Sequence, residues 1–161
     1  MINKTQEIRK VSTKQEKADA LAVRRQVFVI EQKVPESLEV DAYDDDPSVI
    51  HFVAYREGKP TGAGRLRMYD VHTAKVERVA VLSSERGTGL GRELMLAIER
   101  TAREAGITTL TLHAQCHAQR FYEKLGYQPE GEVFAEAGIE HIRMTKRLND
   151  SYTASQHVGL S

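Results

Sequence analysis

The order of the predicted elements indicates one domain of the α/β (α+β) class, with helices packed on a mixed β-sheet. Strand patterns come first, and a strand–helix–strand–helix–strand order follows in the second half of the chain. The chain has 161 residues, of which 40% are hydrophobic and 29% are charged. This length and this balance suit a single domain with its own hydrophobic core and argue against disorder.

Charge and cysteine content exclude several classes of function. Lys and Arg together number 23, as do Asp and Glu, so the formal net charge is zero and we expect no binding of nucleic acid. Cys116 is the single cysteine, which excludes an internal disulfide framework and a multi-cysteine metal site. The chain shows no apolar leader and no apolar run as long as a membrane span. We therefore expect a cytoplasmic protein that binds no membrane.

The first elements are an edge strand and an amphipathic helix. Residues 5–11 have a weak strand pattern. Over residues 14–31 the apolar side chains recur at helical spacing, with Val23, Val27 and Ile30 in one row. Pro35 and an acidic stretch, residues 36–47, end this helix in a long loop.

A β-hairpin follows the acidic stretch. Residues 48–56 alternate, so that Val53 and Tyr55 face one side of the strand and Phe52 and Ala54 face the other. A turn around Gly58 leads into a second strand, residues 60–69. The two strands are predicted to be antiparallel neighbours.

A third strand, residues 75–81, leads into the most regular helix pattern of the chain. Apolar residues recur at helical spacing from Leu90 to Ala105, and Gly106 ends this helix. A strand at 107–113, a short helix at 117–125 and a last strand pair, 133–136 and 139–148, complete the pattern. We take residues 1–148 as the domain and residues 149–161 as a polar, mobile tail.

A glycine-rich loop joins the third strand to the long helix. It comprises Arg86, Gly87, Thr88, Gly89, Leu90, Gly91 and Arg92. Backbone N–H groups at a helix N-terminus lack partners, and glycines let an anion approach them closely. We interpret the loop as a phosphate cradle, with a simple glycine-rich turn as the alternative. The G-x-G-x-x-G dinucleotide fingerprint is excluded because its last position holds Arg92, and no G-K-[ST] sequence ends the loop.

Two motifs carry a resemblance to a known family. The spacing Arg86-x-x-Gly89-x-Gly91, directly after residues 79–81 (VAV), resembles the acyl-CoA pyrophosphate motif of the GNAT superfamily of N-acetyltransferases. Residues 118–127 (AQRFYEKLGY) are similar to that family's A-x-x-F-Y-x-x-x-G-[FY] helix. The resemblance covers residues 5–148 and implies a mostly antiparallel central sheet with splayed central strands, flanked by helices. Gln115 is a departure, since many relatives carry asparagine there.

The resemblance also implies an activity and a donor site. The activity is acetyl-CoA-dependent N-acetylation of a primary amine, on a small molecule or a protein, by direct attack. From the sequence itself we expect no metal, because the six histidines include no H-x-x-x-H pair within a helical segment. The pantetheine arm of the donor would enter between the strands 75–81 and 107–113. The residues expected to contact acetyl-CoA are Val79, Ala80, Val81, Arg86, Gly87, Thr88, Gly89, Leu90, Gly91, Arg92, Gln115, Ala118 and Phe121.

Tyr122 and Glu77 are the expected catalytic residues. Tyr122 matches the tyrosine that protonates the leaving thiolate in many relatives, and the alternative is a core aromatic residue. Glu77 is expected on the same side of its strand as Val79 and Val81, where some relatives have a general base. The alternative for Glu77 is a carboxylate paired with an arginine of the preceding strand, such as Arg65 or Arg67.

Two further side chains near the same strand end are candidates for chemistry. His113 is a rival base, although a structural histidine is the simpler interpretation. Cys116 has no local arrangement that would make it a nucleophile, so we interpret it as a small buried hydrophobe.

The acceptor is not identified by the sequence. Carboxylates of the acidic stretch, Glu39, Asp41, Asp44, Asp45 and Asp46, could attract a cationic amine or could simply be solvated. Their pattern is also similar to that of acyl-homoserine-lactone synthases, which leaves a synthase-like acyltransferase as a minor alternative. A non-catalytic acyl-CoA sensor or accessory subunit is the alternative outside the enzymes, and a homodimer is left open.

Overall fold

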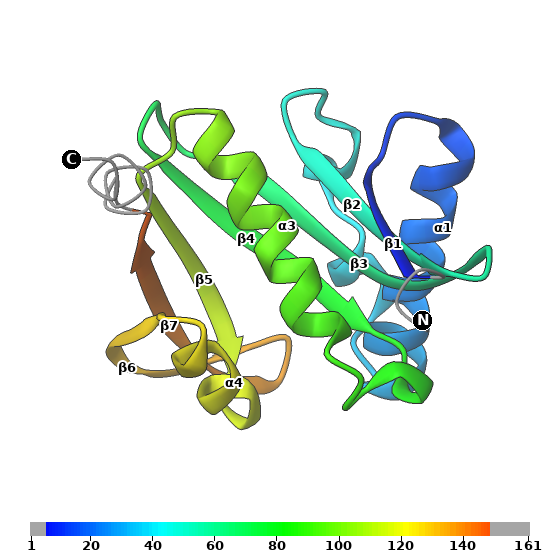
Figure 1. Cartoon of the computed structure of the whole chain (residues 1–161). Coiled ribbons are helices and arrows are strands. Elements are labelled where there is room, and N and C mark those ends of the chain that lie inside the picture. The colour runs from blue at the N-terminus through cyan, green and yellow to red at the C-terminus, as the bar shows by residue number, and fades with distance from the viewer. Residues whose placement is uncertain (1–5, 149–161) are drawn as a thin grey trace.

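The computed structural model describes residues 6–148 and arranges them as one twisted sheet with helices on both faces (Figure 1). Residues 1–5 and the predicted tail at 149–161 lie outside the described residues. The strands are β1 (Gln6–Lys10), β2 (Ile50–Arg56), β3 (Lys59–Met68), β4 (Thr73–Val81), β5 (Thr109–Gln115), β6 (Gln128–Glu136) and β7 (Ile139–Arg147). They form a seven-stranded sheet in the order β1-β2-β3-β4-β5-β7-β6. Neighbouring strands run antiparallel except β4 and β5, which run parallel, so the predicted mixed, mostly antiparallel sheet is confirmed.

Helices form where the periodicity predicted them. The segment 14–31 is helical throughout, as α1 (Lys14–Arg24) followed by a π-helical stretch, η2 (Arg25–Glu31). Thr13 and Glu16 form a capping box that satisfies backbone N–H groups at the start of α1. The longest helix is α3 (Leu90–Glu104), and the short helix before Gly126 is η5 (Cys116–Ala118) with α4 (Gln119–Lys124).

The acidic stretch is more ordered than a loop. It contains a short helix, α2 (Glu36–Glu39), and a 3₁₀ turn, η3 (Ala42–Asp45), in which the Asp41 and Asp44 side chains cap each other's backbone. A second 3₁₀ turn, η4 (Ser83–Glu85), lies between β4 and the glycine-rich loop.

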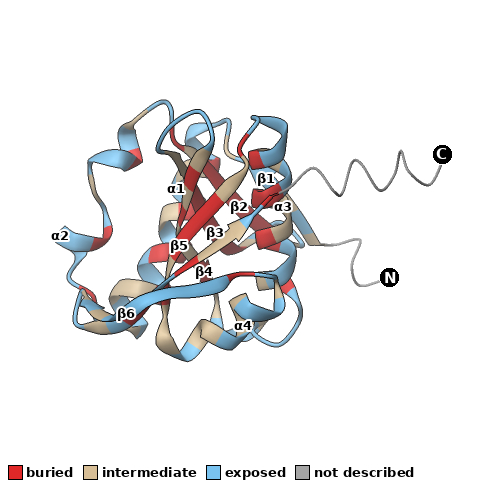
Figure 2. Cartoon of the chain, turned by 90° about the vertical axis from the view of Figure 1, so that its left-hand side faces the viewer, coloured by how far each residue is buried: buried red, intermediate tan, exposed pale blue. Residues whose placement is uncertain are grey.

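Two hydrophobic cores lie on opposite faces of the sheet. One packs α3 against residues that include Phe52 and Leu66, and the other packs α1 against Val53 and Tyr55. The alternation predicted for β2 is thereby confirmed. Gly64 lets α3 approach, because a Cβ there would lie 2.9 Å from the Ile98 Cδ1 atom. Buried residues concentrate in the central strands, whereas β6 and α2 are largely exposed (Figure 2).

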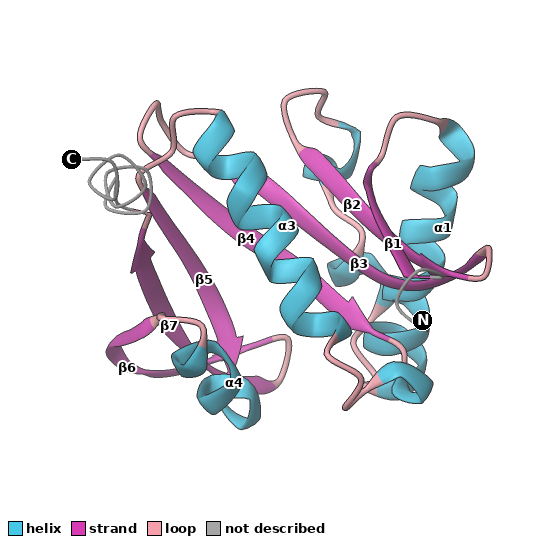
Figure 3. Cartoon of the chain, in the orientation of Figure 1, coloured by secondary structure: helices cyan, strands magenta, loops and turns pink. Residues whose placement is uncertain are grey.

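The two central strands separate along their length. β4 and β5 pair from Thr73 with Thr109 to Val76 with Leu112, and beyond that point they diverge (Figure 3). This confirms the splayed central strands that the family resemblance implied. The splay leaves the last residues of β4 without a partner strand on the β5 side.

A β-bulge in β4 turns Glu77 away from the valines that follow it. Ala63 pairs with Ala80 and Arg65 with Glu77, so β4 has one residue more than β3 in this interval, and Arg78 has a φ of 58°. Val76 and Val79 pack on the α3 core while Ala80 belongs to the α1 core. Glu77 therefore faces α1, and the prediction that it shares a side with Val79 was wrong. The extra residue in the bulge breaks the two-residue period on which that prediction rested.

Candidate active site

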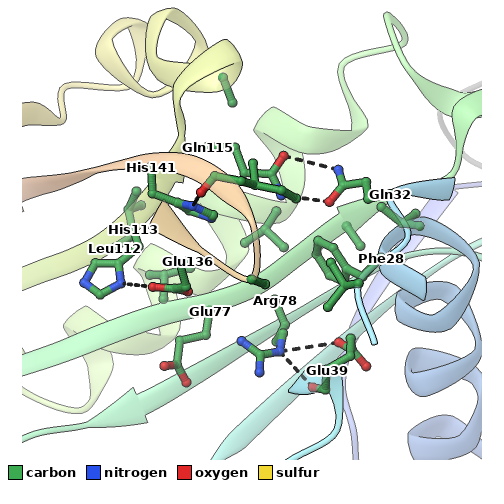
Figure 4. A pocket seen from close by; sticks show the side chains of 18 of the residues that line it. Phe28, Gln32, Glu39, Glu77, Arg78, Leu112, His113, Gln115, Glu136 and His141 are labelled. Atoms are coloured by element: carbon green, nitrogen blue, oxygen red, sulfur yellow. Dashed lines mark hydrogen bonds and ion pairs between the residues drawn. The ribbon is translucent and has the colours of Figure 1, made fainter. Parts of the chain in front are cut away.

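A cavity of about 820 Å³ lies where β4 and β5 separate. Its wall is built by the splayed ends of β4 and β5, by η2 with the loop after it, by α2, and by the turn between β6 and β7. Figure 4 shows Phe28 and Gln32 on one side of this space and Leu112, His113 and His141 on the other. Segments far apart in the sequence thus meet at one site.

The cavity brings together many, but not all, of the predicted site residues. Its wall contains Glu77, Val79, Ala80, Val81, Arg86, Gln115, Ala118 and Tyr122, together with His113. Gly87, Thr88, Gly89, Leu90, Gly91, Arg92 and Phe121 lie outside the wall, in the glycine-rich loop, at the start of α3 and on α4. These elements adjoin the end of β4, because a Cβ at Gly91 would lie 3.3 Å from Phe121 and 3.9 Å from Val81.

Sequence analysis missed part of the wall. The additional polar residues are Glu31, Gln32, Lys75, Arg78, Glu136, His117 and His141. No local motif marks them. Alternation along β4 places Lys75 on the same face as Glu77, and this was the one sequence signal that could have found a member of the set.

Free backbone N–H groups surround the start of α3. Gly89 is the N-cap and has a φ of 91°, a left-handed conformation that favours glycine. Thr88 donates its N–H to Glu85 and Glu93 donates to Gly89. Between them, the N–H groups of residues 89–92 have no acceptor within the described part of the chain. The predicted anion cradle therefore has the donors that it requires.

Backbone groups of β4 also point into the splay. Leu82 donates its N–H to Thr61, on the β3 side. Because the direction of backbone groups alternates along a strand, the N–H group of Val81 points to the opposite side, toward the gap. Val79 lies within the bulge, where this alternation does not apply. A donor on an unpaired strand edge can bind an extended ligand as a neighbouring strand would.

Arg86 is occupied by partners of its own in this structure. Its guanidinium donates two hydrogen bonds to Glu31, at 2.6 and 2.9 Å, and two to the carbonyl oxygen of Val81, at 3.0 and 3.2 Å. Arg86 therefore links the end of β4 to the end of η2.

Glu77 lies in a cluster of basic side chains. Its carboxylate accepts from Arg65 at 2.7 Å and from Arg67 at 3.1 Å, and Lys75 Nζ is 3.4 Å away. Burial alone would raise the pKa of Glu77, but the hydrogen bonds and charges of Arg67 and Arg65 lower that pKa to about 2. The pairing with Arg65 and Arg67, considered as the alternative from the sequence, is present.

Tyr122 lies at the wall with its ring held by other aromatic residues. The ring centroids of Phe121 and Tyr127 lie 4.9 and 5.9 Å from that of Tyr122, both in edge-to-face geometry. Burial raises the pKa of Tyr122 to about 12. Its hydroxyl makes no hydrogen bond to residues 6–148, so it remains a proton donor with no competing acceptor in that part of the protein.

His113 is oriented by a carboxylate. Its Nδ1 atom lies 2.8 Å from Glu136 Oε1 and 3.3 Å from Lys75 Nζ, and its ring packs edge-on against Phe134. With a proton on Nδ1 the ring donates to Glu136 and Nε2 is its proton acceptor, whereas without that proton Nδ1 accepts from Lys75. Cys116, next to Gln115, is a partly buried free cysteine.

The acidic stretch folds inward onto arginines. Arg24, which is 1% exposed, donates to Glu39 at 2.8 Å and to Asp44 at 2.6 Å. Arg65 bonds Asp41 and Asp44. Burial would raise the pKa of Asp44, but hydrogen bonding and charge from Arg24 lower it. Glu39, Asp41 and Asp44 therefore have arginine partners, and neither interpretation of the stretch holds for these three; Asp45 remains exposed and Asp46 is half-buried.

The described residues offer neither a cluster of metal ligands nor a membrane-spanning helix. Residues 6–148 contain no group of three or more His, Cys, Asp or Glu side chains placed to hold a metal ion. Over the same residues, no helix is long and apolar enough to cross a membrane.

A sheet that splays between β4 and β5, beside a helix that starts with free N–H groups, defines the class of acyl-CoA-dependent acyltransferases. Within that class the chain belongs to the GNAT acetyltransferase family, because the family model described as acetyltransferase (GNAT) domain matches residues 8–148. The family resemblance drawn from the sequence motifs is confirmed. This family binds CoA and its acyl derivatives, and the residues at the splay fit such a donor.

Relatives and solved structures agree with the family. The uncharacterized protein YyaT of Bacillus subtilis is 40% identical over 147 residues, which cover 91% of this chain and 99% of that protein. The uncharacterized N-acetyltransferase YjcF of the same organism is 43% identical over 129 residues, 80% of this chain and 90% of that protein. The crystal structure of an acyl-CoA N-acyltransferase from Pseudomonas aeruginosa matches with a TM-score of 0.76 at 33% identity, over 88% of this chain and 97% of that one.

Proposed function

We propose that the protein transfers an acetyl group from acetyl-CoA to a primary amine. The observation that carries this proposal is the alignment of free backbone donors at two places. On the unpaired edge of β4 the N–H group of Val81 faces the splay, and the N–H groups of residues 89–92 lie beside the end of the same strand. The first suits an amide or the thioester carbonyl of an acyl-pantetheine arm, and the second set suits a diphosphate.

The donor site is assigned to the residues that line this path. Val79, Ala80 and Val81 would bind the arm, with Gln115, Ala118 and Phe121 on the other side. Gly87, Thr88, Gly89, Leu90 and Gly91 would hold the diphosphate, with Arg86 and Arg92 supplying positive charge. Arg86 would exchange Glu31 for phosphate when the donor binds.

The reaction is a direct displacement. The amine nitrogen forms a bond to the thioester carbonyl carbon, the carbon–sulfur bond breaks, and the products are an amide and free CoA. The amine loses one proton and the thiolate gains one. Tyr122 is assigned as the donor of the second proton, because its hydroxyl has no competing acceptor in the described chain and its ring is held in place.

Two groups are candidates for the first proton. Glu77 faces the cavity, but a pKa of about 2 makes its carboxylate a weak base. His113 also faces the cavity and is oriented by Glu136. We assign proton acceptance to His113, and we assign to Glu77 the neutralisation of Arg65, Arg67 and Lys75 around the acceptor.

One experiment tests binding and chemistry separately. Thermal unfolding with CoA and acetyl-CoA measures donor binding, since a ligand that prefers the native state raises the melting temperature by mass action. Incubation of acetyl-CoA with a panel of primary amines, with products identified by mass, measures transfer. Stabilisation with transfer supports the proposal, stabilisation without transfer to any amine favours the acyl-CoA sensor, and no stabilisation contradicts both.

A further inference from the structure

The acceptor end of the cavity carries a combination of features that the proposed reaction alone does not require. We infer that the acceptor is a primary monoamine with an apolar body, and that polyamines and other polycations are poor substrates. This inference rests on the proposed function and names the substrate class of the same site. It is carried by the pairing of the carboxylates and by the apolar side chains between them.

The carboxylates at the acceptor end of the described wall have partners within the protein. Glu39 Oε2 accepts from Arg24 at 2.8 Å, Glu77 accepts from Arg65 at 2.7 Å, and Glu136 lies 2.8 Å from His113 Nδ1. Glu39 Oε1 is buried without a hydrogen bond in the described residues, and Glu31 would lose Arg86 only at the donor end of the cavity. A second ammonium group near His113 would have to break the pair of Glu77 or of Glu136, or enter the cavity unpaired. Burying an unpaired charge is strongly unfavourable.

Cationic side chains in the same wall add repulsion. Lys75 and Arg78 both line the cavity and are both largely buried beside their partners. Since like charges in a partly desolvated site repel, these groups oppose a second positive charge on the substrate. The charges of the wall therefore favour an amine whose reacting nitrogen is neutral and which carries no ammonium group elsewhere.

Apolar side chains occupy the space between the ion pairs. Phe28, Val34 and Leu38 line the cavity from η2 and the segment after it, and Leu112 and Ile139 line it from β5 and β7. Leu38 is 55% exposed, so much of its side chain is in contact with water in this structure. A ligand with apolar surface would remove these side chains from water, which is favourable in proportion to the area covered.

The position of His113 sets the direction of the substrate. His113 and Glu136 lie on one side of the cavity and Phe28 lies on the other (Figure 4). An amine whose nitrogen is near His113 therefore directs its remaining atoms toward Phe28 and Leu38.

The test compares two amines that differ in one terminal group. Hexylamine and hexane-1,6-diamine have the same chain, and the diamine adds a second ammonium together with a second reactive nitrogen. We expect the wild-type kcat/KM for hexylamine to exceed that for the diamine by about tenfold or more. Equal values, or a preference for the diamine, would overturn the inference and leave the proposed acetyl transfer intact. Failure to acetylate either amine would overturn the inference, because hexylamine belongs to the class that it names, whereas the melting shift and the amine panel decide the proposed function separately.

Variants of the apolar wall make the test independent of the absolute rates. Leu38→Glu and Ile139→Glu each place a carboxylate without a partner on the wall, from opposite sides. Each should shift the ratio of the two kcat/KM values about tenfold toward the diamine, while the uncharged control Leu38→Gln should leave the ratio within about twofold of wild type. If both glutamate variants keep the wild-type ratio, the wall does not contact the body of the acceptor and the inference fails.

Discussion

Gln32 and Gln115 exchange two amide hydrogen bonds across the cavity although they lie 83 residues apart. Gln115 Nε2 donates to Gln32 Oε1 at 2.8 Å, and Gln32 Nε2 donates to Gln115 Oε1 at 3.2 Å. His117 Nε2 makes a third contact, 2.6 Å from Gln115 Oε1. The neighbouring Glu31 holds Arg86, so the end of η2 is bonded to both walls of the proposed donor site.

The amide pair predicts that Gln32 competes with the donor. A pantetheine arm carries amides with the same donor and acceptor groups as Gln32, so Gln115 would exchange one partner for the other. Gln32→Ala should tighten binding of CoA by about fivefold, the value of one hydrogen bond of roughly 1 kcal/mol, and Gln115→Ala should weaken it by a similar factor. Calorimetric titration measures both. Gln15→Ala, in an exposed pair on α1, is the matched control. Weaker binding by Gln32→Ala would mean that Gln32 itself contacts the donor.

The anion cradle predicts a loss of affinity that depends on charge. Gly89→Asp adds a negative charge beside the free N–H groups and also places a side chain at a φ of 91°. Gly89→Asn has nearly the same shape and the same backbone strain without the charge. Both variants should lose about 1 kcal/mol of folding stability. CoA affinity should fall at least tenfold further for the aspartate than for the asparagine, and equal affinities would show that no phosphate binds there.

Tyr122→Phe should slow the chemical step and leave donor binding nearly unchanged. Phenylalanine keeps the edge-to-face contacts of the ring, and the lost hydroxyl bonds to nothing in the described chain, so stability should stay near that of wild type. A general acid contributes about 10²–10⁴-fold, and because a thiolate is already a fair leaving group the loss should be at or below about 10²-fold. Single-turnover acetyl transfer and equilibrium binding of acetyl-CoA separate the two effects. An unchanged single-turnover rate would make Tyr122 a packing residue.

Glu77→Gln and His113→Gln should fail in different ways. The pKa of Glu77 is lowered to about 2 in the folded protein, so its stabilising effect is complete above its ordinary pKa and is lost as the pH falls toward 2. In Glu77→Gln, Arg65 stays buried but loses this partner, so the free energy of unfolding should fall by about 3 kcal/mol at pH 7. Between pH 4.5 and 2 the stability of the variant should fall less steeply than that of wild type, because the variant has no carboxylate to protonate at this position.

His113→Gln should lower kcat, because the proton acceptor is removed. Chemical denaturation across pH and pH–rate profiles measure the two behaviours. A pH–rate profile that is unchanged in His113→Gln but altered at low pH in Glu77→Gln would return the role of base to Glu77.

Several features followed from residues close together in the sequence. The helix that became α3 shows an uninterrupted apolar period, and the glycine loop and the 118–127 motif each lie within ten residues or so. Local spacing of this kind determines backbone conformation and the presentation of free N–H groups. The family could therefore be recognised from local motifs, and the resemblance to it implied the splay of the central strands and the place of Tyr122 at the site.

Other features depended on contacts that no local pattern encodes. Because of the bulge at Arg78, Glu77 faces the side of the sheet opposite to the one predicted. The bulge is part of the register between β3 and β4, which is set by the packing of both strands. β6 starts at Gln128 and not near 133, because its register shifts between Glu130 and Phe134 and its side chains are mostly exposed, which hides the two-residue period.

The acidic stretch shows most clearly which properties follow from local sequence and which depend on tertiary contacts. Its composition determined that Glu39, Asp41 and Asp44 carry negative charge, and the sequence alone determined nothing about their partners. The tertiary structure decided that they meet Arg24, Arg65 and Arg78, which come from α1, β3 and β4. Charges leave water only where opposite charges meet them in good geometry, and that geometry exists only after the chain has folded.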